Sequence, residues 1–192
     1  MSGHHRCGLT GELPVVVCLS LCRWDVPNGF EQAVSSIIMF LLSTGARLNE
    51  ALTATWANVD QGRGVWKVAA KRLKSKKNRQ IPLDESALWG LSELKSKGVS
   101  PYLFPSPVTG KPYVTITRAW YRIRAEAGVE MRIHDLRHSF ASLPVTNGRS
   151  LYEVQSILGH SAPKVTMRYA HLSVGTLKAA ANAGSVLVPQ AA

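Results

Sequence analysis

Apolar residues recur at helical spacing along much of this sequence, in segments separated by glycine, proline and polar turns. In residues 30–43 the apolar positions form so wide a stripe that we expect a core helix rather than a surface helix. Thr44 and Gly45 should end this helix, because glycine tolerates the left-handed conformation found at helix ends.

A second, short helix is expected directly after this turn, with Ala51 and Leu52 as its apolar residues. Arg47 then lies at a junction between two buried elements, where a guanidinium group requires an anionic partner. Glu50, one turn further on, is the candidate partner within the chain, and a ligand phosphate is the candidate outside it.

Two short runs, residues 65–68 and 80–83, are predicted to be the strands of a β-hairpin. The eleven residues between them contain six basic residues. Any one of these cations fits an ordinary solvated loop, but as a group they indicate a hairpin tip that contacts phosphates. They are Lys71, Arg72, Lys74, Lys76, Lys77 and Arg79.

The second half of the sequence predicts further helices, each with recognisable start or stop signals. Ser150 and Glu153 form a capping box, and Pro163 suits the first turn of a helix. With one small hairpin among these helices, the fold class is mainly α with a small antiparallel β-hairpin or sheet. The predicted helices run from Asp84 or Ser86 to about Lys97, from Thr115 or Thr117 to Gly128, from near His134 to a kink or early end at Pro144, from Ser150 to Gly159, and onward from Ser161.

The charge balance narrows the class of partner. The chain has 23 Lys and Arg against 12 Asp and Glu, a formal net charge of +11. This favours a polyanion, with nucleic acid first and an anionic membrane surface second. No apolar run approaches the roughly 20 residues of a membrane helix, and no signal peptide pattern is convincing. We therefore expect a cytoplasmic protein without a membrane partner.

The three cysteines are confined to the first 22 residues and are odd in number. They indicate no disulfide framework, and their spacing matches no established zinc pattern. A metal bound together with His4 and His5 is the alternative, but we expect ordinary reduced thiols and no metal.

The most chemically suggestive residues fall within residues 132–172, in the motifs HDLRH, LGH and MRYAHL. His134 and Arg137 are three residues apart and project from one helix face on neighbouring turns. His160 follows a leucine–glycine pair, and Tyr169 lies nine residues further on. Arginine grips phosphate oxygens with a planar fork, histidine moves protons near neutral pH, and tyrosine can form a covalent intermediate. The set favours a phosphodiester substrate, although each residue alone could be structural.

Four strings resemble the catalytic domain of the tyrosine recombinases, the phage integrase family, in the order and spacing of that family. They are STGARLNEAL (43–52), KSKKNRQIPL (74–83), HDLRHSFAS (134–142) and LYEVQSILGHSAPKVTMRYAHL (151–172). The resemblance covers about residues 30–175. It therefore implies a catalytic domain over 30–175, an N-terminal extension of unclear structure over 1–29 and a C-terminal tail over 176–192 that is a candidate docking segment.

The same resemblance implies a DNA breaking-rejoining fold and an activity, the site-specific cutting and rejoining of double-stranded DNA through a 3′-phosphotyrosine intermediate. Members of the family act as homo-oligomers on DNA, as tetramers, and a monomer is the alternative for the free protein. The chemistry needs no metal or nucleotide.

Carried over by position, the resemblance implies a role for each residue of the set. The two arginines would hold the non-bridging oxygens of the phosphate, and the tyrosine would attack it. One histidine would accept the proton of the tyrosine, the second would donate a hydrogen bond to the phosphate, and a hairpin lysine would protonate the leaving 5′-oxygen. The arginines are Arg47 and Arg137, and the nucleophile is Tyr169. His134 would accept the proton, and His160 would donate the hydrogen bond. Lys74 would be the proton donor, with Lys76 or Lys77 as alternatives, and Glu50 is the acidic companion of Arg47.

The sequence is compatible with three functional interpretations. Family members usually carry an N-terminal helical domain that completes a clamp around DNA, and this sequence leaves no room for one. The chain could therefore be an active catalytic domain or a catalytically idle DNA-binding or assembly fragment. A type IB topoisomerase uses a similar set of residues, but such enzymes more often have lysine where this chain has His134.

Overall fold

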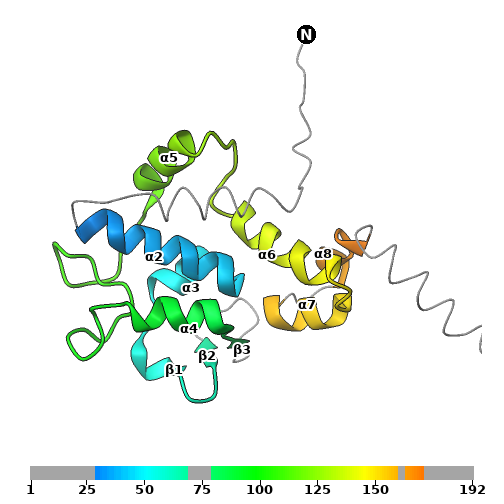
Figure 1. Cartoon of the computed structure of the whole chain (residues 1–192), viewed down its shortest axis with the longest axis horizontal. Helices are drawn as coiled ribbons and strands as arrows, with labels where there is room; N and C mark the ends of the chain where they lie inside the picture. The colour runs from blue at the N-terminus through cyan, green and yellow to red at the C-terminus, as the bar shows by residue number, and fades with distance from the viewer. Residues whose placement is uncertain (1–28, 69–78, 160–162, 171–192) are drawn as a thin grey trace, which may run out of the picture. The chain divides into compact units, whose positions relative to one another are not determined.

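The structure, a computed structural model, describes residues 29–68, 79–159 and 163–170 (Figure 1). The chain divides into two compact units, Met1–Phe140 and Ala141–Ala192, and each is described here by itself. In the part of the chain that the structure describes, no helix is both long enough and apolar enough to cross a membrane.

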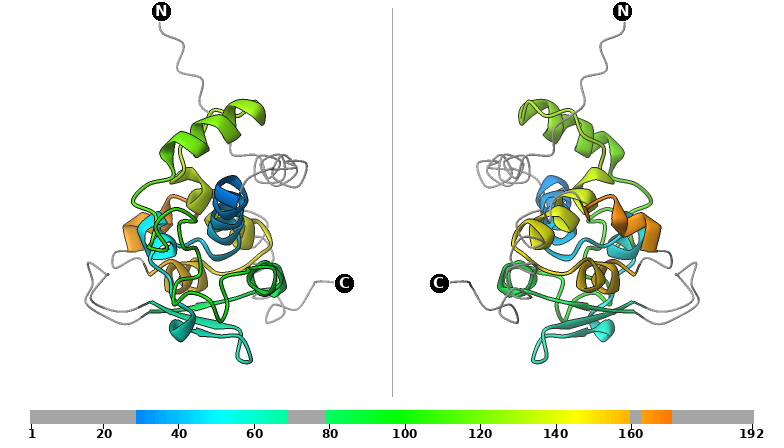
Figure 2. Two further views of the ribbon diagram at one scale, coloured as in Figure 1. Left: turned by 90° about the vertical axis from the view of Figure 1, so that its left-hand side faces the viewer. Right: turned by 90° about the vertical axis from the view of Figure 1, so that its right-hand side faces the viewer.

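The first unit is built around helix α2 (Gly29–Thr44), which packs against α3 (Leu48–Leu52) and α4 (Glu85–Ser92). A short 3-10 helix, η1 (Trp56–Asn58), leads into the sheet, and α5 (Thr117–Glu126) follows the long loop after α4. Figure 2 shows α5 and the sheet at opposite ends of this unit, with α2 between them. The mainly helical class is thus confirmed, as are the predicted α2 and α3.

The sheet has three antiparallel strands in the order β1 (Val59–Asp60), β2 (Val65–Val68), β3 (Arg79–Pro82). The pair β2–β3 confirms the predicted hairpin, with β3 beginning one residue earlier than predicted and Val68 opposite Arg79. Strand β1 was not predicted, because two residues are too few to show an alternating pattern. The predicted cationic tip, residues 69–78, lies outside the described residues.

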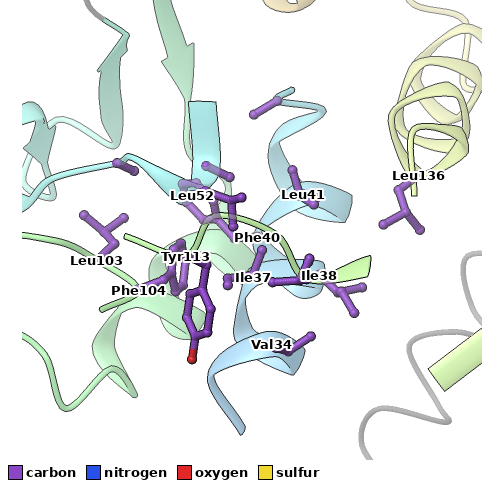
Figure 3. Close-up of a cluster of buried hydrophobic side chains, with 14 of the residues drawn as sticks. Val34, Ile37, Ile38, Phe40, Leu41, Leu52, Leu103, Phe104, Tyr113 and Leu136 are labelled. Carbon is purple, nitrogen blue, oxygen red and sulfur yellow. The ribbon is translucent and has the colours of Figure 1, made fainter. Parts of the chain in front are cut away.

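One apolar core fills the first unit, and the apolar stripe of α2 supplies its centre (Figure 3). The Phe40 ring lies 5.1 Å from that of Trp66 on β2 and 5.5 Å from that of Phe104, measured between centroids. Such tilted aromatic pairs add to the free energy gained by burial. Leu103 and Phe104 bring the loop after α4 into this core.

Helix α4 ends at Ser92, five residues before the predicted end at Lys97. The cause is Ser96, whose hydroxyl donates to the Leu103 carbonyl (2.6 Å) and accepts from Trp56 Nε1 (3.2 Å). These bonds hold the segment after α4 in separate turns, so tertiary contacts override its helical pattern.

Helix α6 (Asp135–Thr146) begins in the first unit and ends in the second. It continues two residues beyond Pro144, so the predicted early end at this proline is wrong. Proline removes one backbone donor and crowds the carbonyl four residues earlier. The helix tolerates this near its C-terminal end, since it continues only to Thr146.

The second unit also contains α7 (Leu151–Leu158) and α8 (Pro163–Met167), which pack together. The predicted capping box is confirmed, since the Ser150 N–H donates to the Glu153 carboxylate (2.8 Å) and the Glu153 N–H donates to the Ser150 hydroxyl (3.2 Å). Gly159 ends α7 in the left-handed conformation (φ 63°), also as predicted.

Candidate active site

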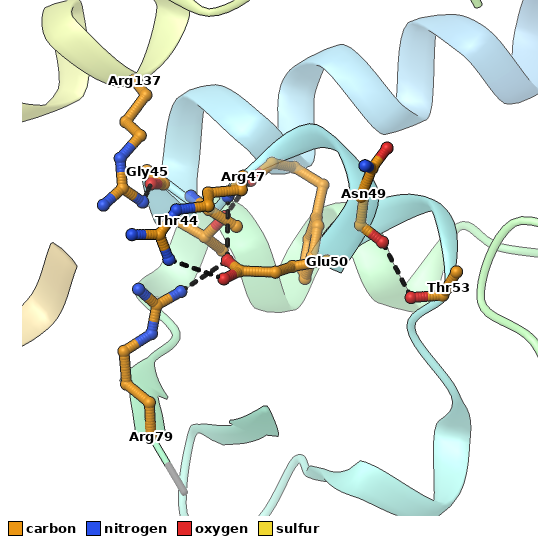
Figure 4. Close-up of polar contacts among 10 residues, drawn as sticks. Thr44, Gly45, Arg47, Asn49, Glu50, Thr53, Arg79 and Arg137 are labelled. Atoms are coloured by element: carbon orange, nitrogen blue, oxygen red, sulfur yellow. Dashed lines mark hydrogen bonds and ion pairs between the residues drawn. The ribbon is translucent and has the colours of Figure 1, made fainter. Parts of the chain in front are cut away.

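The site in the first unit is built on the sharp turn between α2 and α3 (Figure 4). The Thr44 hydroxyl donates to the Phe40 carbonyl (2.5 Å), and the Gly45 N–H donates to the Leu41 carbonyl (2.9 Å). Gly45 has φ +60°, which reverses the chain and brings Arg47 to the start of α3. The glycine that the sequence predicted as a helix end therefore also sets the direction of the first arginine.

Gly45 leaves no space for a side chain, so Gly45→Ala is expected to lower the free energy of unfolding by about 4 kcal/mol. A Cβ at this position would lie 2.2 Å from Phe140 Cδ1. Overpacking and a left-handed alanine each cost roughly 1–3 kcal/mol. Urea denaturation measures the change, and Gly98→Ala is the control, since Gly98 has φ +79° but no atom within 4 Å of an added Cβ. Equal losses in the two variants would contradict the packing argument.

The carboxylate of Glu50 binds two arginines. Its Oε1 accepts from Arg47 Nη1 (2.9 Å), and its Oε2 accepts from both the Arg47 N–H (2.9 Å) and Arg79 Nη2 (2.6 Å). The Glu50 side chain is 3% exposed and that of Arg79 is 7% exposed, whereas 44% of the Arg47 side chain is accessible. The predicted pairing of Arg47 with Glu50 is confirmed, and Arg47 is the member of this group that a ligand can reach.

Arg137, on the first turns of α6, contributes a third guanidinium group. It is buried, and its Nη1 donates to the carbonyl of Gly45 (2.5 Å) across 92 residues of sequence. Figure 4 shows the guanidinium groups of Arg47, Arg79 and Arg137 on the same side of the α2–α3 turn. Arg47 and Arg79 share the carboxylate of Glu50, and Arg137 is bound to the Gly45 carbonyl of the same turn. Guanidinium groups gathered in this way suit an anion such as a phosphodiester.

His134 lies one residue before α6 and is exposed. Its pKa is lowered, first by desolvation and then by the positive charge of Arg137, while Asp135 acts in the opposite direction. A lowered pKa keeps the imidazole neutral at pH 7, and the neutral form can accept a proton. The ring also stands edge-on to that of His138, with 5.2 Å between centroids.

Arg79 is the residue whose position differs most from expectation. The sequence grouped it with the phosphate-contacting tip, but the structure places it in a buried position of β3, paired with Glu50. A signal for this was present, because Arg79, Ile81 and Leu83 alternate with exposed Gln80 and Pro82 and so share the inner face of the strand.

The remaining predicted site residues belong to the second unit or lie outside the described residues. Tyr169 follows α8 in the second unit, is 3% exposed, and its N–H donates to the Thr166 carbonyl (3.0 Å). Within residues 29–68, 79–159 and 163–170, no three metal-ligating side chains gather. Outside the described residues lie Lys71, Arg72, Lys74, Lys76, Lys77 and His160.

Known proteins with similar sequences agree on one family. The profile described as the phage integrase family matches residues 27–175. The integrase of Haemophilus phage HP1 (strain HP1c1) is 33% identical over 156 residues, which cover 81% of this chain and 42% of the phage protein. The tyrosine recombinase XerD of Haemophilus ducreyi (strain 35000HP / ATCC 700724) is 31% identical over 171 residues, which cover 80% and 56%. The chain thus spans about half the length of the relatives that it matches.

Solved structures agree with this result. The catalytic domain of bacteriophage HP1 integrase has a TM-score of 0.65 and 25% identity, covering 92% of this chain and 94% of that one. The XerH site-specific recombinase bound to its difH substrate has a TM-score of 0.72 and 23% identity, covering 92% and 52%. The fold is therefore that of the tyrosine recombinase catalytic domain. Together with the matched profile, this shows that the chain belongs to the phage integrase family.

Proposed function

We propose that this chain is the catalytic part of a site-specific DNA recombinase, which cuts and rejoins double-stranded DNA through a 3′-phosphotyrosine intermediate. The observation that carries the proposal is the gathering of three guanidinium groups at the α2–α3 turn, where Arg47 and Arg79 bind Glu50 and Arg137 binds the Gly45 carbonyl. Relatives named integrase and tyrosine recombinase support it. From the family resemblance and the absence of a convincing signal peptide in the sequence, we further propose that the protein acts as a homo-oligomer on double-stranded DNA in the cytoplasm.

A phosphodiester is anionic and repels a nucleophile, so catalysis must first neutralise its charge. Arg47 and Arg137 are suited to hold the two non-bridging oxygens and to stabilise the pentavalent transition state. Tyr169 would attack the phosphorus in line, and the 5′-oxygen of the next nucleotide would leave. The bond between phosphorus and the 5′-oxygen is thereby exchanged for a phosphotyrosine bond, which a 5′-hydroxyl can later reverse.

Proton transfers complete this step. A free tyrosine has a pKa of about 10, so only about one molecule in a thousand is ionised at pH 7. His134, with its lowered pKa, is proposed to accept or share the proton of Tyr169. Lys74 is proposed to protonate the leaving oxygen, with Lys76 and Lys77 as alternatives, and His160 to donate a hydrogen bond to the phosphate.

Covalent trapping tests the proposed function. Nicked duplexes are tiled across the DNA that flanks the gene, each designed so that the short fragment beyond the cleaved phosphate dissociates and religation is blocked. The expected result is a protein–DNA adduct that survives denaturing electrophoresis. Protein that binds these duplexes but never forms the adduct would identify an idle DNA-binding fragment. Adduct formation with DNA relaxation but no strand exchange would indicate a topoisomerase.

The basic segment between β2 and β3 is proposed to bind DNA through phosphate contacts, and this makes a prediction about salt. If Lys71, Arg72, Lys76 and Lys77 all contact phosphates, the logarithm of the association constant should fall with a slope of about −0.9 per contact against the logarithm of salt. Replacing all four with glutamine should flatten the slope by about 3 to 4. Fluorescence anisotropy with a labelled duplex measures the slopes of wild type and variant. Identical slopes would show that this segment does not contact the DNA.

A further inference from the structure

We propose that Arg79 is a positioning residue, which aligns Arg47 through the shared carboxylate of Glu50 and joins the base of the β2–β3 hairpin to the α2–α3 turn. This inference rests on the proposed function, because it concerns how one of the proposed phosphate-binding arginines is held. Arg79 is buried on β3 and its Nη2 donates to Glu50 Oε2 (2.6 Å), so we place its effect on Arg47 through this carboxylate.

The hydrogen bonds around Glu50 show how this alignment works. Its Oε2 accepts from Arg79 on one side and from the Arg47 N–H on the other, and its Oε1 accepts from the Arg47 side chain. A carboxylate held at one oxygen cannot rotate about its terminal bond without losing a charge-assisted hydrogen bond. Of these three donors only that of Arg79 comes from outside Arg47, so Arg79 fixes the plane of the carboxylate relative to the sheet, and that plane sets the direction of the Arg47 guanidinium.

The position of Arg79 in the sheet adds a second link. Arg79 pairs with Val68 across β2 and β3, and it is the first residue of β3 after residues 69–78 of the sequence. Lys74, the proposed general acid, belongs to that segment. One buried ion pair thus connects the base of the hairpin that carries Lys74 to the turn that carries Arg47.

The energetic balance argues against a purely structural role for Arg79. Burial lowers the pKa of its guanidinium, and the charge of Arg47 acts in the same direction, while Glu50 opposes both. Removing a guanidinium from water is costly, and an apolar side chain at an inner strand position often stabilises a core at least as well. The orientation that Arg79 imposes on Glu50, seen in its hydrogen bond to Oε2, accounts for a charge whose burial is costly.

The first test uses the protein alone. In Arg79→Met the Arg47 N–H should exchange its hydrogen for deuterium about tenfold faster or more, because its acceptor, Glu50 Oε2, loses the hydrogen bond from Arg79. The Arg132 N–H is an internal reference, since it also donates to a carboxylate, that of Asp135 (2.8 Å). Its exchange rate should not change. Unchanged protection at Arg47, measured by NMR, would overturn the inference whether or not the protein cleaves DNA.

The second test measures the rate of adduct formation on two substrates. Arg79→Met should slow cleavage of an ordinary phosphodiester about 10- to 100-fold, as expected when a catalytic group is misplaced. On a methylphosphonate, which lacks the negative charge that Arg47 would neutralise, the loss should shrink to about threefold or less. Arg47→Met should show the same pattern. An equal loss on both substrates would mean that Arg79 merely stabilises the fold.

Two further variants keep these outcomes interpretable. Arg79→Lys retains the charge without the planar fork and should lie between wild type and Arg79→Met. Arg63→Met, on the exposed turn between β1 and β2, makes the same change in net charge away from Glu50 and should behave as wild type. If wild type forms no adduct, the proposed function fails while the exchange test still decides the role of Arg79. If wild type and Arg79→Met cleave equally, only the positioning role fails.

Discussion

Replacing Tyr169 with phenylalanine is expected to abolish the covalent protein–DNA adduct and to leave DNA binding intact. Phenylalanine keeps the aromatic ring but lacks the oxygen that would form the bond to phosphorus, so no alternative route to the adduct exists in the proposed mechanism. We expect a loss of more than about 10⁴-fold, which is the scale seen when a nucleophile is removed. Denaturing electrophoresis of the nicked-duplex reaction measures it.

Tyr152→Phe is the matched control for this experiment. Tyr152 lies on α7 in the same unit, is 77% exposed, and loses the same hydroxyl group in the variant. It should form the adduct at the wild-type rate. Because Tyr169 is buried, the melting temperature of Tyr169→Phe is measured in parallel. An adduct that persists in a folded Tyr169→Phe protein would show that another residue is the nucleophile.

Replacing Arg137 with methionine is expected to slow adduct formation about 10³-fold, because the loss of one donor to a developing oxyanion typically costs 10²- to 10³-fold. The affinity for duplex DNA should change much less, since one phosphate contact among many is lost. Single-turnover cleavage and fluorescence anisotropy on the same duplex separate the two effects. Arg137→Lys keeps the charge but not the planar fork, and it should remain well below wild type.

Folding must be checked for Arg137→Met, because Arg137 is buried and its Nη1 donates to the Gly45 carbonyl. That carbonyl would lose a hydrogen bond, which contributes about 1 kcal/mol or somewhat more when the donor is charged. A variant that melts a few degrees lower but cleaves at the wild-type rate would remove Arg137 from the chemistry. It would leave Arg137 only as a contact between α6 and the turn at Gly45.

The features that the sequence predicted well are those in which a local pattern and its structural cause coincide. The broad apolar stripe of α2 is typical of a buried helix, and the capping box at Ser150 marks the residue at which α7 begins. The glycines at 45 and 159 mark helix ends because both adopt positive φ. The ion pair between Arg47 and Glu50 was also predictable, since the two residues are three positions apart at the start of a helix.

The features that were missed depend on contacts between distant segments. The early end of α4 follows from hydrogen bonds that Ser96 makes to Trp56 and Leu103. Arg79 was assigned to the hairpin tip because the basic run hides its place in the strand alternation. No periodicity reveals that its partner is Glu50, 29 residues earlier in the chain.

The geometry of Glu50 also has a consequence for how the protein loses activity. Helix α3 has only five residues, too few to be stable alone, and the N–H of its N-cap residue, Arg47, donates to the same carboxylate that pairs with the Arg47 and Arg79 side chains. Local fraying of α3 therefore releases both arginines at once. Molecules in which α3 has unfolded locally should have no activity rather than reduced activity. On heating, activity should therefore be lost when this helix opens, before the whole domain unfolds.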